Sequence, residues 1–433
     1  MKPILTSLIL LFNTIVLFAQ TNISGNISQN TSWTKSGSPY ILSGDVIITD
    51  KATLTIEPGT IIKFNKDAQI KLRGILKAIG TKTDSIIFTS NQVSPSKSDY
   101  IGIKPEINTS VPWREQIHQI EMEYCVFMYA ATVFNTKSVF NGPYTFKNCR
   151  FGYNTYINTD ISQYSHPIYF YNCLFHDNLW CLRGAGEGIY NINDCWFVNN
   201  QVGAINVDNV DRCVFIGNTY YGTMHCDTVQ NSYFINNGVG ALADMHDDTK
   251  FSNNELYNND TGVVIYRMWN RYDIVFKGNK ICKNNYLNIV YQWYNEVDIS
   301  DNCWCSNDSS FIASRIYDKH VDSTLGILKF DYSQKCTTSS PPPATVSVLR
   351  EERTKLSLYP NPAYETVTIA FDYNPRNSYQ INVLDISGKL LFEKANIQTG
   401  EISLNTKELQ SGLYLVVLLK KQNVLAIEKM IVQ

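Results

Sequence analysis

Carboxylate, imidazole and guanidinium side chains recur in successive stretches of the chain that each open with a glycine and a short apolar run. Asp208 and Asp227 hold equivalent positions in two of these stretches, and Asp244, His246 and Arg267 follow on or beside the same stripe. Two carboxylates about 5 Å apart would raise each other's pKa or share a Ca²⁺ ion. Because glycoside cleavage uses such a pair, these five residues are the candidate catalytic residues.

Motifs of several common enzyme classes do not occur in the chain, including GxSxG, HExxH and the Walker loop. Two other interpretations of the same residues therefore stay open, a ligand-binding face and a solvated polar face. The sequence has no CxxC pair, so we expect no zinc-type metal site and no cofactor. A Ca²⁺ ion between paired acids stays open.

Aromatic residues follow the acidic stretches. Successive strand residues point to opposite sides, so the run from Tyr291 to Tyr294 must place at least one ring outside. Exposed Trp and Tyr rings stack on the apolar faces of sugar rings, whereas buried ones pack a core. The candidate binding residues are Trp269, Trp293, Tyr294 and His225. The remaining histidines, including His176, show no partner in the sequence, and we interpret them as structural.

All these residues belong to a repeat. Between residues 46 and 88, pairs of apolar residues separated by one position recur about every eight residues. Further on, five units of 18 to 24 residues carry the pattern Cys-x-Phe, at Cys125, Cys149, Cys173, Cys195 and Cys213. Asparagine follows five residues after the start of successive units, at Asn154, Asn178, Asn200, Asn218, Asn237, Asn259, Asn284 and Asn307.

This period, with short strands and no helical pattern, predicts an all-β right-handed parallel β-helix over residues 30–336. The asparagines are expected to form a hydrogen-bonded ladder and to adopt the left-handed conformation that a sharp corner needs. Residues 90–116 hold three prolines and break the repeat, which predicts a loop that leaves the coil.

Eleven cysteines in one chain first suggest disulfides. The five in the Cys-x-Phe pattern share one inward position, so we expect reduced thiols in the core. A disulfide stays open for Cys282, Cys303, Cys305 and Cys336.

The 433 residues carry a formal net charge of −2. Nucleic-acid binding needs a basic stripe that neutralises phosphates, so we expect no nucleic-acid partner. Residues 1–19 contain a lysine, then an apolar run, then Ala19. This order predicts a cleaved signal peptide, and a membrane anchor is the alternative. No later segment is long and apolar enough to span a bilayer, so we expect no transmembrane segment in the mature chain.

A linker with three consecutive prolines is expected at residues 337–355. Beyond it, short alternating strands at 366–371, 378–384, 389–394, 412–419 and 426–432 predict a small Ig-like β-sandwich over residues 356–433.

Four motifs occur in this tail. They are Tyr359-Pro360-Asn361-Pro362, Val383-Leu384-Asp385-Ile386-Ser387-Gly388, Gly412-Leu413-Tyr414 and Lys429-Met430-Ile431-Val432. With these motifs the tail resembles the type A C-terminal sorting domain of the type IX secretion system of Bacteroidetes. The resemblance implies passage through the outer membrane by that machinery, removal of the tail, and attachment to surface glycolipid or release. Residues 54–60 resemble the first coils of bacterial right-handed β-helix proteins, among which are polysaccharide lyases and hydrolases.

Together these features predict a secreted or cell-surface protein that binds a polysaccharide or adheres without catalysis. A polysaccharide lyase or glycoside hydrolase is the first alternative, and a structural spacer in the cell coat is the second.

Overall fold

The computed structural model describes residues 20–106, 108, 110–112, 118–135, 143–159, 167–184, 190–245, 249–268, 275–331, 356–373, 375, 378–385, 390–420 and 423–433. The chain divides into two compact units, Met1–Thr338 and Ser339–Gln433. Within the described residues, no helix has both the length and the apolar character that crossing a membrane requires. The predicted signal peptide at 1–19 and the linker at 337–355 lie outside the described residues.

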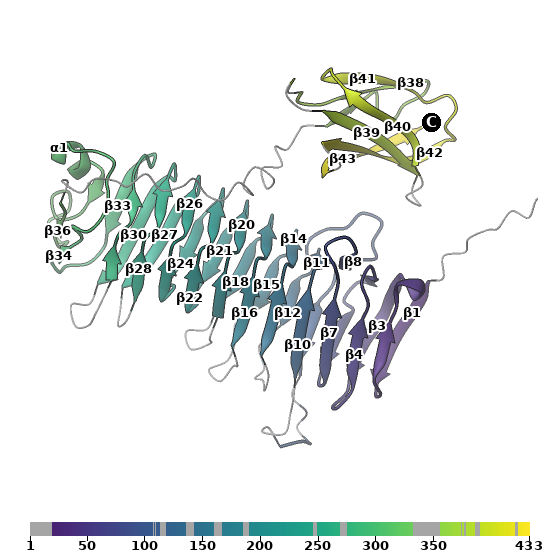
Figure 1. Ribbon diagram of the computed structural model, residues 1–433, viewed down its shortest axis with the longest axis horizontal. Helices are drawn as coiled ribbons and strands as arrows, with labels where there is room; N and C mark the ends of the chain where they lie inside the picture. Colours follow the sequence, from purple (N-terminus) through teal and green to yellow (C-terminus); the bar gives the residue numbers. More distant parts are fainter. Residues whose placement is uncertain are drawn as a thin grey trace, which may run out of the picture. The chain divides into compact units, whose positions relative to one another are not determined.

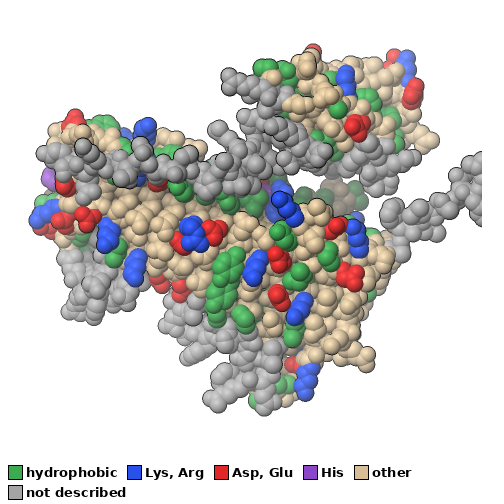
Figure 2. Space-filling view, in the orientation of Figure 1, with side chains coloured by type: hydrophobic (Ala, Val, Ile, Leu, Met, Phe, Trp, Pro, Cys, Tyr) green, Lys and Arg blue, Asp and Glu red, His purple; other side chains and the backbone are tan. Residues whose placement is uncertain are grey.

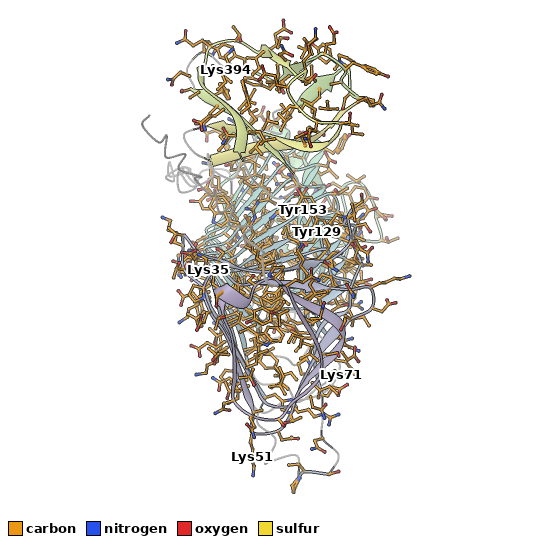
Figure 3. All side chains as sticks on the ribbon, turned by 90° about the vertical axis from the view of Figure 1, so that its right-hand side faces the viewer. Lys35, Lys51, Lys71, Tyr129, Tyr153 and Lys394 are labelled. Atoms are coloured by element: carbon orange, nitrogen blue, oxygen red, sulfur yellow. A yellow bond between two sulfur atoms is a disulfide. The ribbon has the colours of Figure 1, made fainter. Side chains whose placement is uncertain are left out.

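The first unit is a solenoid of three-sided coils, whose strands stack into three parallel ladders (Figure 1). We name these ladders face 1, face 2 and face 3, in the order in which each coil passes through them, and name each corner by the faces that it joins. Figure 3 views the three-sided outline from the N-terminal end. The predicted parallel β-helix is confirmed.

Face 1 consists of β2 (Thr31–Trp33), β4 (Thr53–Ile56), β7 (Ile75–Ile79), β10 (Gln119–Glu123), β13 (Tyr144–Lys147), β16 (Ile168–Tyr171), β19 (Tyr190–Asn193), β22 (Asn209–Asp211), β25 (Thr228–Gln230), β28 (Lys250–Ser252) and β31 (Val275–Lys277).

Face 2 consists of β5 (Ile61–Phe64), β8 (Ile86–Ser90), β11 (Cys125–Met128), β14 (Arg150–Gly152), β17 (Leu174–His176), β20 (Trp196–Val198), β23 (Val214–Ile216), β26 (Tyr233–Ile235), β29 (Glu255–Tyr257) and β32 (Lys280–Ile281).

Face 3 consists of β6 (Gln69–Leu72), β9 (Gly102–Pro105), β12 (Thr132–Asn135), β15 (Tyr156–Thr159), β18 (Trp180–Arg183), β21 (Val202–Ile205), β24 (Tyr221–Met224), β27 (Val239–Met245), β30 (Thr261–Met268), β33 (Leu287–Tyr291) and β35 (Ile316–Tyr317).

The first strands, β1 (Thr21–Ile27) and β3 (Tyr40–Ile48), bend across the 2/3 corner and contribute to both of these faces, with the short helix η1 (Lys35–Gly37) between them. The solenoid thus begins upstream of residue 30. At the other end it closes with β34 (Val297–Asp298), β36 (Leu328–Lys329) and the short helix α1 (Ser309–Ala313).

Inward side chains of one kind stack from coil to coil and form the core. On face 2 the rings of consecutive phenylalanines lie nearly parallel, with centroids 4.4 to 5.4 Å apart. The stack comprises Phe88, Phe127, Phe151, Phe175, Phe197, Phe215 and Phe234. Stacked aromatic rings add to the apolar area that each coil buries.

A ladder of buried asparagines lines the 2/3 corner. The Oδ1 of Asn200 accepts hydrogen bonds from the backbone N (2.9 Å) and the Nδ2 (3.0 Å) of Asn178. Its own Nδ2 donates to the carbonyl of Phe175 at 3.0 Å. The pattern repeats at Asn154, Asn178, Asn218, Asn237 and Asn259. Each rung satisfies backbone groups that a corner would otherwise leave without partners.

Two details of the predicted ladder are wrong. The left-handed conformation belongs to the residue before each asparagine, such as Tyr153 (φ 59°) before Asn154, because the turn is made where the side chain points outward. Asn307 is exposed and lies outside the ladder, since the Nδ2 of Asn284 donates to Asn288 at 3.0 Å instead.

The 1/2 corner carries the second ladder. Its inward position holds Cys149, Cys173, Cys195 and Cys213, then Ser232, Asn254, Asn279 and Asn302 in successive coils. Cys125, at the matching position of the first of these coils, is buried and free, as are the other four cysteines of the predicted pattern. At the C-terminal end, Cys282 and Cys305 form a disulfide, and Cys303 is also disulfide-bonded.

The predicted loop at 90–116 is interrupted, because residues 102–105 form β9 and pair in register with β6 on face 3. The stretch before β9 lies against the 2/3 corner. There the backbone N of Asp99 donates to the carbonyl of Tyr129 at 3.0 Å, and the hydroxyls of Ser98 and Thr155 lie 2.7 Å apart.

The second unit has its own apolar core between two antiparallel sheets, which is consistent with the predicted sandwich. The sequence pattern missed β37 and β41. One sheet contains β37 (Ser357–Tyr359), β38 (Thr366–Ala370) and β41 (Glu401–Asn405). The other contains β39 (Tyr379–Asp385), β40 (Leu390–Ile397), β42 (Gly412–Lys420) and β43 (Asn423–Val432).

Motif residues from the two ends of this unit meet. The Oδ1 of Asn361, between Pro360 and Pro362, accepts a hydrogen bond from the backbone N of Ile431 at 2.9 Å. Tyr414 is buried and donates its hydroxyl to the carbonyl of Gln410 at 2.6 Å. Gly412 starts β42, Lys429 lies in β43, and Gly388 lies outside the described residues.

Candidate functional site

The 3/1 corner brings two of the predicted residues together across neighbouring coils. His225 follows β24 and turns the chain with φ 51°, and Asp244 lies near the end of β27 in the next coil. The Nδ1 of His225 lies 3.5 Å from the Oδ2 of Asp244. The Asp244 side chain is only 7% exposed, and that of His225 is 26% exposed. A buried carboxylate beside an imidazole helps to orient the ring.

The next coil adds an aromatic ring to this pair. Tyr266, on β30, meets His225 edge to face with centroids 6.2 Å apart, and the residue is 44% exposed. Arg267 pairs in register with Asp244 along the backbone. His225, Asp244 and Tyr266 thus form one cluster over three coils, with an imidazole, a carboxylate and a partly exposed ring.

Asp208 and Asp227 are equivalent residues of adjacent coils, since the backbone N of Asp227 donates to Val207 and that of Thr228 donates to Asp208. The Asp208 carboxylate turns to the preceding coil, where its Oδ2 accepts from the backbone N of Tyr190 at 2.6 Å. Burial raises the pKa of the Asp208 carboxyl above its usual range, and the bond from Tyr190 partly offsets that shift. Asp208 therefore anchors the backbone of the neighbouring coil.

The aromatic candidates differ in exposure. Trp293 is half-buried and packs against the solenoid core, while Tyr294 beside it is 64% exposed, with ring centroids 4.6 Å apart. Tyr291 is fully buried in the same run. His246 and Trp269 lie outside the described residues, as does the side chain of Arg267.

One cluster of polar and aromatic side chains was missed by the sequence reasoning. His176, interpreted as structural, hydrogen-bonds both Arg150 and Asp177 and contacts the ring of Tyr153 at the 2/3 corner. Arg150 and His176 are 26 residues apart, close to the 24-residue spacing of their coils. Laying the coils side by side would have placed them together.

The side of the solenoid seen in Figure 2 carries scattered charges of both signs, with some hydrophobic side chains between them. Face 1 strands point residues such as Asn191, Asn209 and Thr228 outward. Among the described residues, no group of three or more His, Cys, Asp or Glu side chains is arranged to hold a metal ion.

Comparisons with known proteins bear on both units. Residues 357–433 match the secretion system C-terminal sorting domain, and residues 25–110 match the pectate-lyase like beta helix domain. The chain is 38% identical over 66 residues to Protein bark beetle of Drosophila melanogaster, a match that covers 15% of this chain and 2% of that protein.

Among solved structures, the Azotobacter vinelandii mannuronan C-5 epimerase AlgE6 A-module matches with 13% identity and a TM-score of 0.29, over 65% of this chain and 78% of that one. The sorting tail indicates handling by the type IX secretion system, and so secretion or display at the cell surface. The chain is a β-helix protein with a pectate-lyase-like N-terminal segment and a type IX secretion C-terminal sorting domain.

Proposed function

We propose that this exported protein binds a polysaccharide at the 3/1 corner of its solenoid and does so without catalysis. The observation that carries the proposal is the cluster of His225, Asp244 and Tyr266, which joins hydrogen-bonding groups to a partly exposed ring. Pockets for sugars combine these two kinds of group, because polar atoms fix orientation while aromatic rings supply contact area. Tyr294, one coil further along the same corner, extends the aromatic surface.

Binding is favoured over a two-carboxylate hydrolysis because of Asp208. Hydrolysis by such a pair needs both carboxylates to face the scissile bond from the two sides of the sugar. The Asp208 carboxylate instead accepts a hydrogen bond from the backbone of Tyr190 in the coil on its other side. The Asp208 carboxylate is thus held by a backbone group of the preceding coil, while Asp227 belongs to the following coil.

One observation supports a second candidate function. His225 lies beside the buried carboxylate of Asp244, an arrangement that prepares an imidazole for proton transfer. A polysaccharide lyase or hydrolase that uses His225 would yield unsaturated or shortened products. Mass spectrometry of a polysaccharide panel incubated with the full chain, with and without Ca²⁺, tests this candidate, and His225→Gln should then abolish the products.

The binding proposal is tested by affinity electrophoresis of the full chain in gels that contain each polysaccharide of the panel. Tyr266→Ala and Tyr294→Ala should each weaken retention about three- to tenfold, the value of one aromatic contact. The matched control is Tyr286→Ala, since Tyr286 is 69% exposed and enters β33 at the opposite, 2/3 corner.

Retention lowered by Tyr266→Ala and Tyr294→Ala, with Tyr286→Ala unchanged, would support the site at the 3/1 corner. Equal retention of all four proteins on every polysaccharide that the unmodified chain binds would refute it. Thermal unfolding of each variant shows whether the fold is kept.

A further inference from the structure

We propose that the 2/3 corner holds a second binding site, for an anionic sugar unit, centred on Arg150. The site is built by Arg150, His176, Asp177, Tyr153 and Tyr129 from three successive coils. It lies on a different corner from the cluster around His225, so it goes beyond the function proposed above and can fail independently of it.

A hydrogen-bonded relay fixes the position of the guanidinium. The Nε of Arg150 donates to the Nε2 of His176 at 2.9 Å, and the Nδ1 of His176 lies 3.0 Å from the Oδ2 of Asp177. Because an arginine Nε–H can only donate, Nε2 is the acceptor and the ring proton sits on Nδ1, facing Asp177. The ring itself is held in place: His176 is 9% exposed and lies over Gly152, where an added Cβ would approach it to 2.4 Å.

The relay leaves the outer edge of the guanidinium turned away from His176. Arg150 is exposed, and its neighbours in register on face 2 are Val126 and Leu174, which carry no charge. Among the described residues, no carboxylate forms an ion pair with Arg150. The two terminal nitrogens of a fixed guanidinium match the two oxygens of a carboxylate or a sulfate.

A pair of tyrosine rings continues the site. Tyr153 meets His176 edge to face with centroids 5.3 Å apart, and Tyr129 stacks on Tyr153 at 5.9 Å with 17° between the rings. Figure 3 shows the two tyrosines close together on one corner of the solenoid. Tyr153 is 38% exposed, so its ring offers an apolar surface to a sugar beside the fixed guanidinium.

The segment before β9 lines a separate pocket that neighbours the tyrosine pair. A pocket of about 420 Å³ is lined by Lys66, Gln92, Val93, Ser94, Ser98 and Asp99. Its volume is within the range that small ligands occupy. Asp99 joins the pocket to the tyrosines, because its backbone N donates to Tyr129. The Asp99 carboxylate accepts two hydrogen bonds from Ser96, and Lys66 supplies a cation to the lining of the pocket.

The ligand class follows from these groups. A fixed, unpaired guanidinium selects an oxyanion, and the adjoining rings select a flat apolar surface. A sugar that bears a carboxylate or a sulfate combines both features in one unit. These two anions share the same chemistry, so the experiment must separate them.

The test uses the full chain and three oligosaccharides with one β-1,4-glucan backbone: neutral, oxidised to the carboxylate at C6, and sulfated at C6. Binding is measured by isothermal titration calorimetry. Arg150→Ala should weaken binding of at least one anionic oligosaccharide about tenfold and change binding of the neutral one less than about twofold. Tyr153→Ala should weaken binding of every oligosaccharide that binds, whereas Tyr153→Phe should not.

His176 is a positioning residue in this site, so its test is the ratio of anionic to neutral affinity. His176→Ala should lower that ratio toward the value of Arg150→Ala, and Arg150→Lys should recover part of it because the charge remains. The matched control is Arg212→Ala, which removes an exposed arginine that pairs with Asp194 elsewhere on the solenoid.

Loss of anionic binding in Arg150→Ala but not in Arg212→Ala would support the site, and the oligosaccharide affected would identify the anion. Equal effects of the two arginine variants, or no binding of either anionic oligosaccharide by the full chain, would overturn it. Tyr266→Ala should leave these affinities unchanged, which separates this site from the one at the 3/1 corner.

Discussion

At the scale of single residues, the buried cysteines explain how an exported chain keeps thiols. Seven of the cysteines that the structure describes are free, and all seven are buried. Burial raises the pKa of the Cys226 thiol to about 12 and holds those of Cys181 and Cys195 well above their usual range. Since the thiolate is the form that oxidises and exchanges, the core protects Cys181, Cys195 and Cys226 chemically as well as sterically.

These shifted thiols predict a loss of stability in alkali. A thiol in the unfolded chain ionises near pH 8.5, whereas Cys226 in the folded chain stays protonated until about pH 12. Its contribution to the free energy of unfolding is therefore intact below about pH 8.5 and falls by up to about 1.4 kcal/mol per pH unit above it. Urea unfolding between pH 7.5 and about pH 9.5 should show a shallower decline for Cys226→Ala than for the unmodified chain. Identical slopes would contradict this account.

At this scale, the sequence predicted which side chains are buried better than it predicted which polar side chains contact each other. The Cys-x-Phe pattern was enough to assign Cys149 and Phe151 to the core, because inward positions alternate along a strand. The link from Arg150 to His176 is less direct, because Arg150 pairs in register with Leu174 and reaches the histidine two residues further along β17. The turn of the Asp208 carboxylate toward Tyr190 depends on a side-chain rotamer that no sequence pattern encodes.

At the scale of elements, the corners supplement the hydrogen bonds of short strands. Strands of three or four residues, such as β23 and β24, form few backbone hydrogen bonds each. The asparagine ladder adds side-chain bonds to the backbone at every 2/3 corner that it lines. The sequence predicted this ladder, but it could not show which residue of the corner takes the left-handed conformation.

Removing one rung should therefore be costly. Asn200→Ala removes the acceptor of two Asn178 donors and the donor to the Phe175 carbonyl. The backbone N of Asn178 and the carbonyl of Phe175 lose these partners, whereas the Nδ2 of Asn178 keeps its bond to the Phe151 carbonyl. The loss should lower the free energy of unfolding by at least about 2 kcal/mol, measured by urea unfolding. Asn209→Ala on the outer side of face 1 is the control and should change it by less than about 0.5 kcal/mol. A small effect at Asn200 would mean that water replaces the rung.

At the scale of the whole molecule, the candidate binding sites and the sorting motifs lie in different units. The solenoid carries both candidate sites, and the C-terminal unit carries the sorting motifs with a core of its own. The bond from Ile431 to Asn361 ties the last strand to the motif at the start of the unit. This contact brings the motifs at the two ends of the tail together in space.

Deleting residues 356–433 should stop export while the solenoid still folds. We expect cell fractionation and immunoblotting to find the truncated chain inside the cell, with the far-ultraviolet circular dichroism of a β-protein after purification. Asn361→Ala, which removes the acceptor for Ile431, should reduce export less than the deletion does. Normal amounts of the truncated chain outside the cell would show that another signal directs secretion.

The disulfide between Cys282 and Cys305 gives the solenoid a mechanical polarity. Coils stacked in parallel can be peeled off one at a time by tension, because each rung breaks before the next one bears load. Force applied to the C-terminal side reaches this disulfide, which joins residues 23 positions apart in the sequence, before it reaches the hydrogen-bonded coils upstream. The C-terminal end of the solenoid is thus reinforced against tearing, whereas the described coils nearer the N-terminus depend on hydrogen bonds and stacked rings alone.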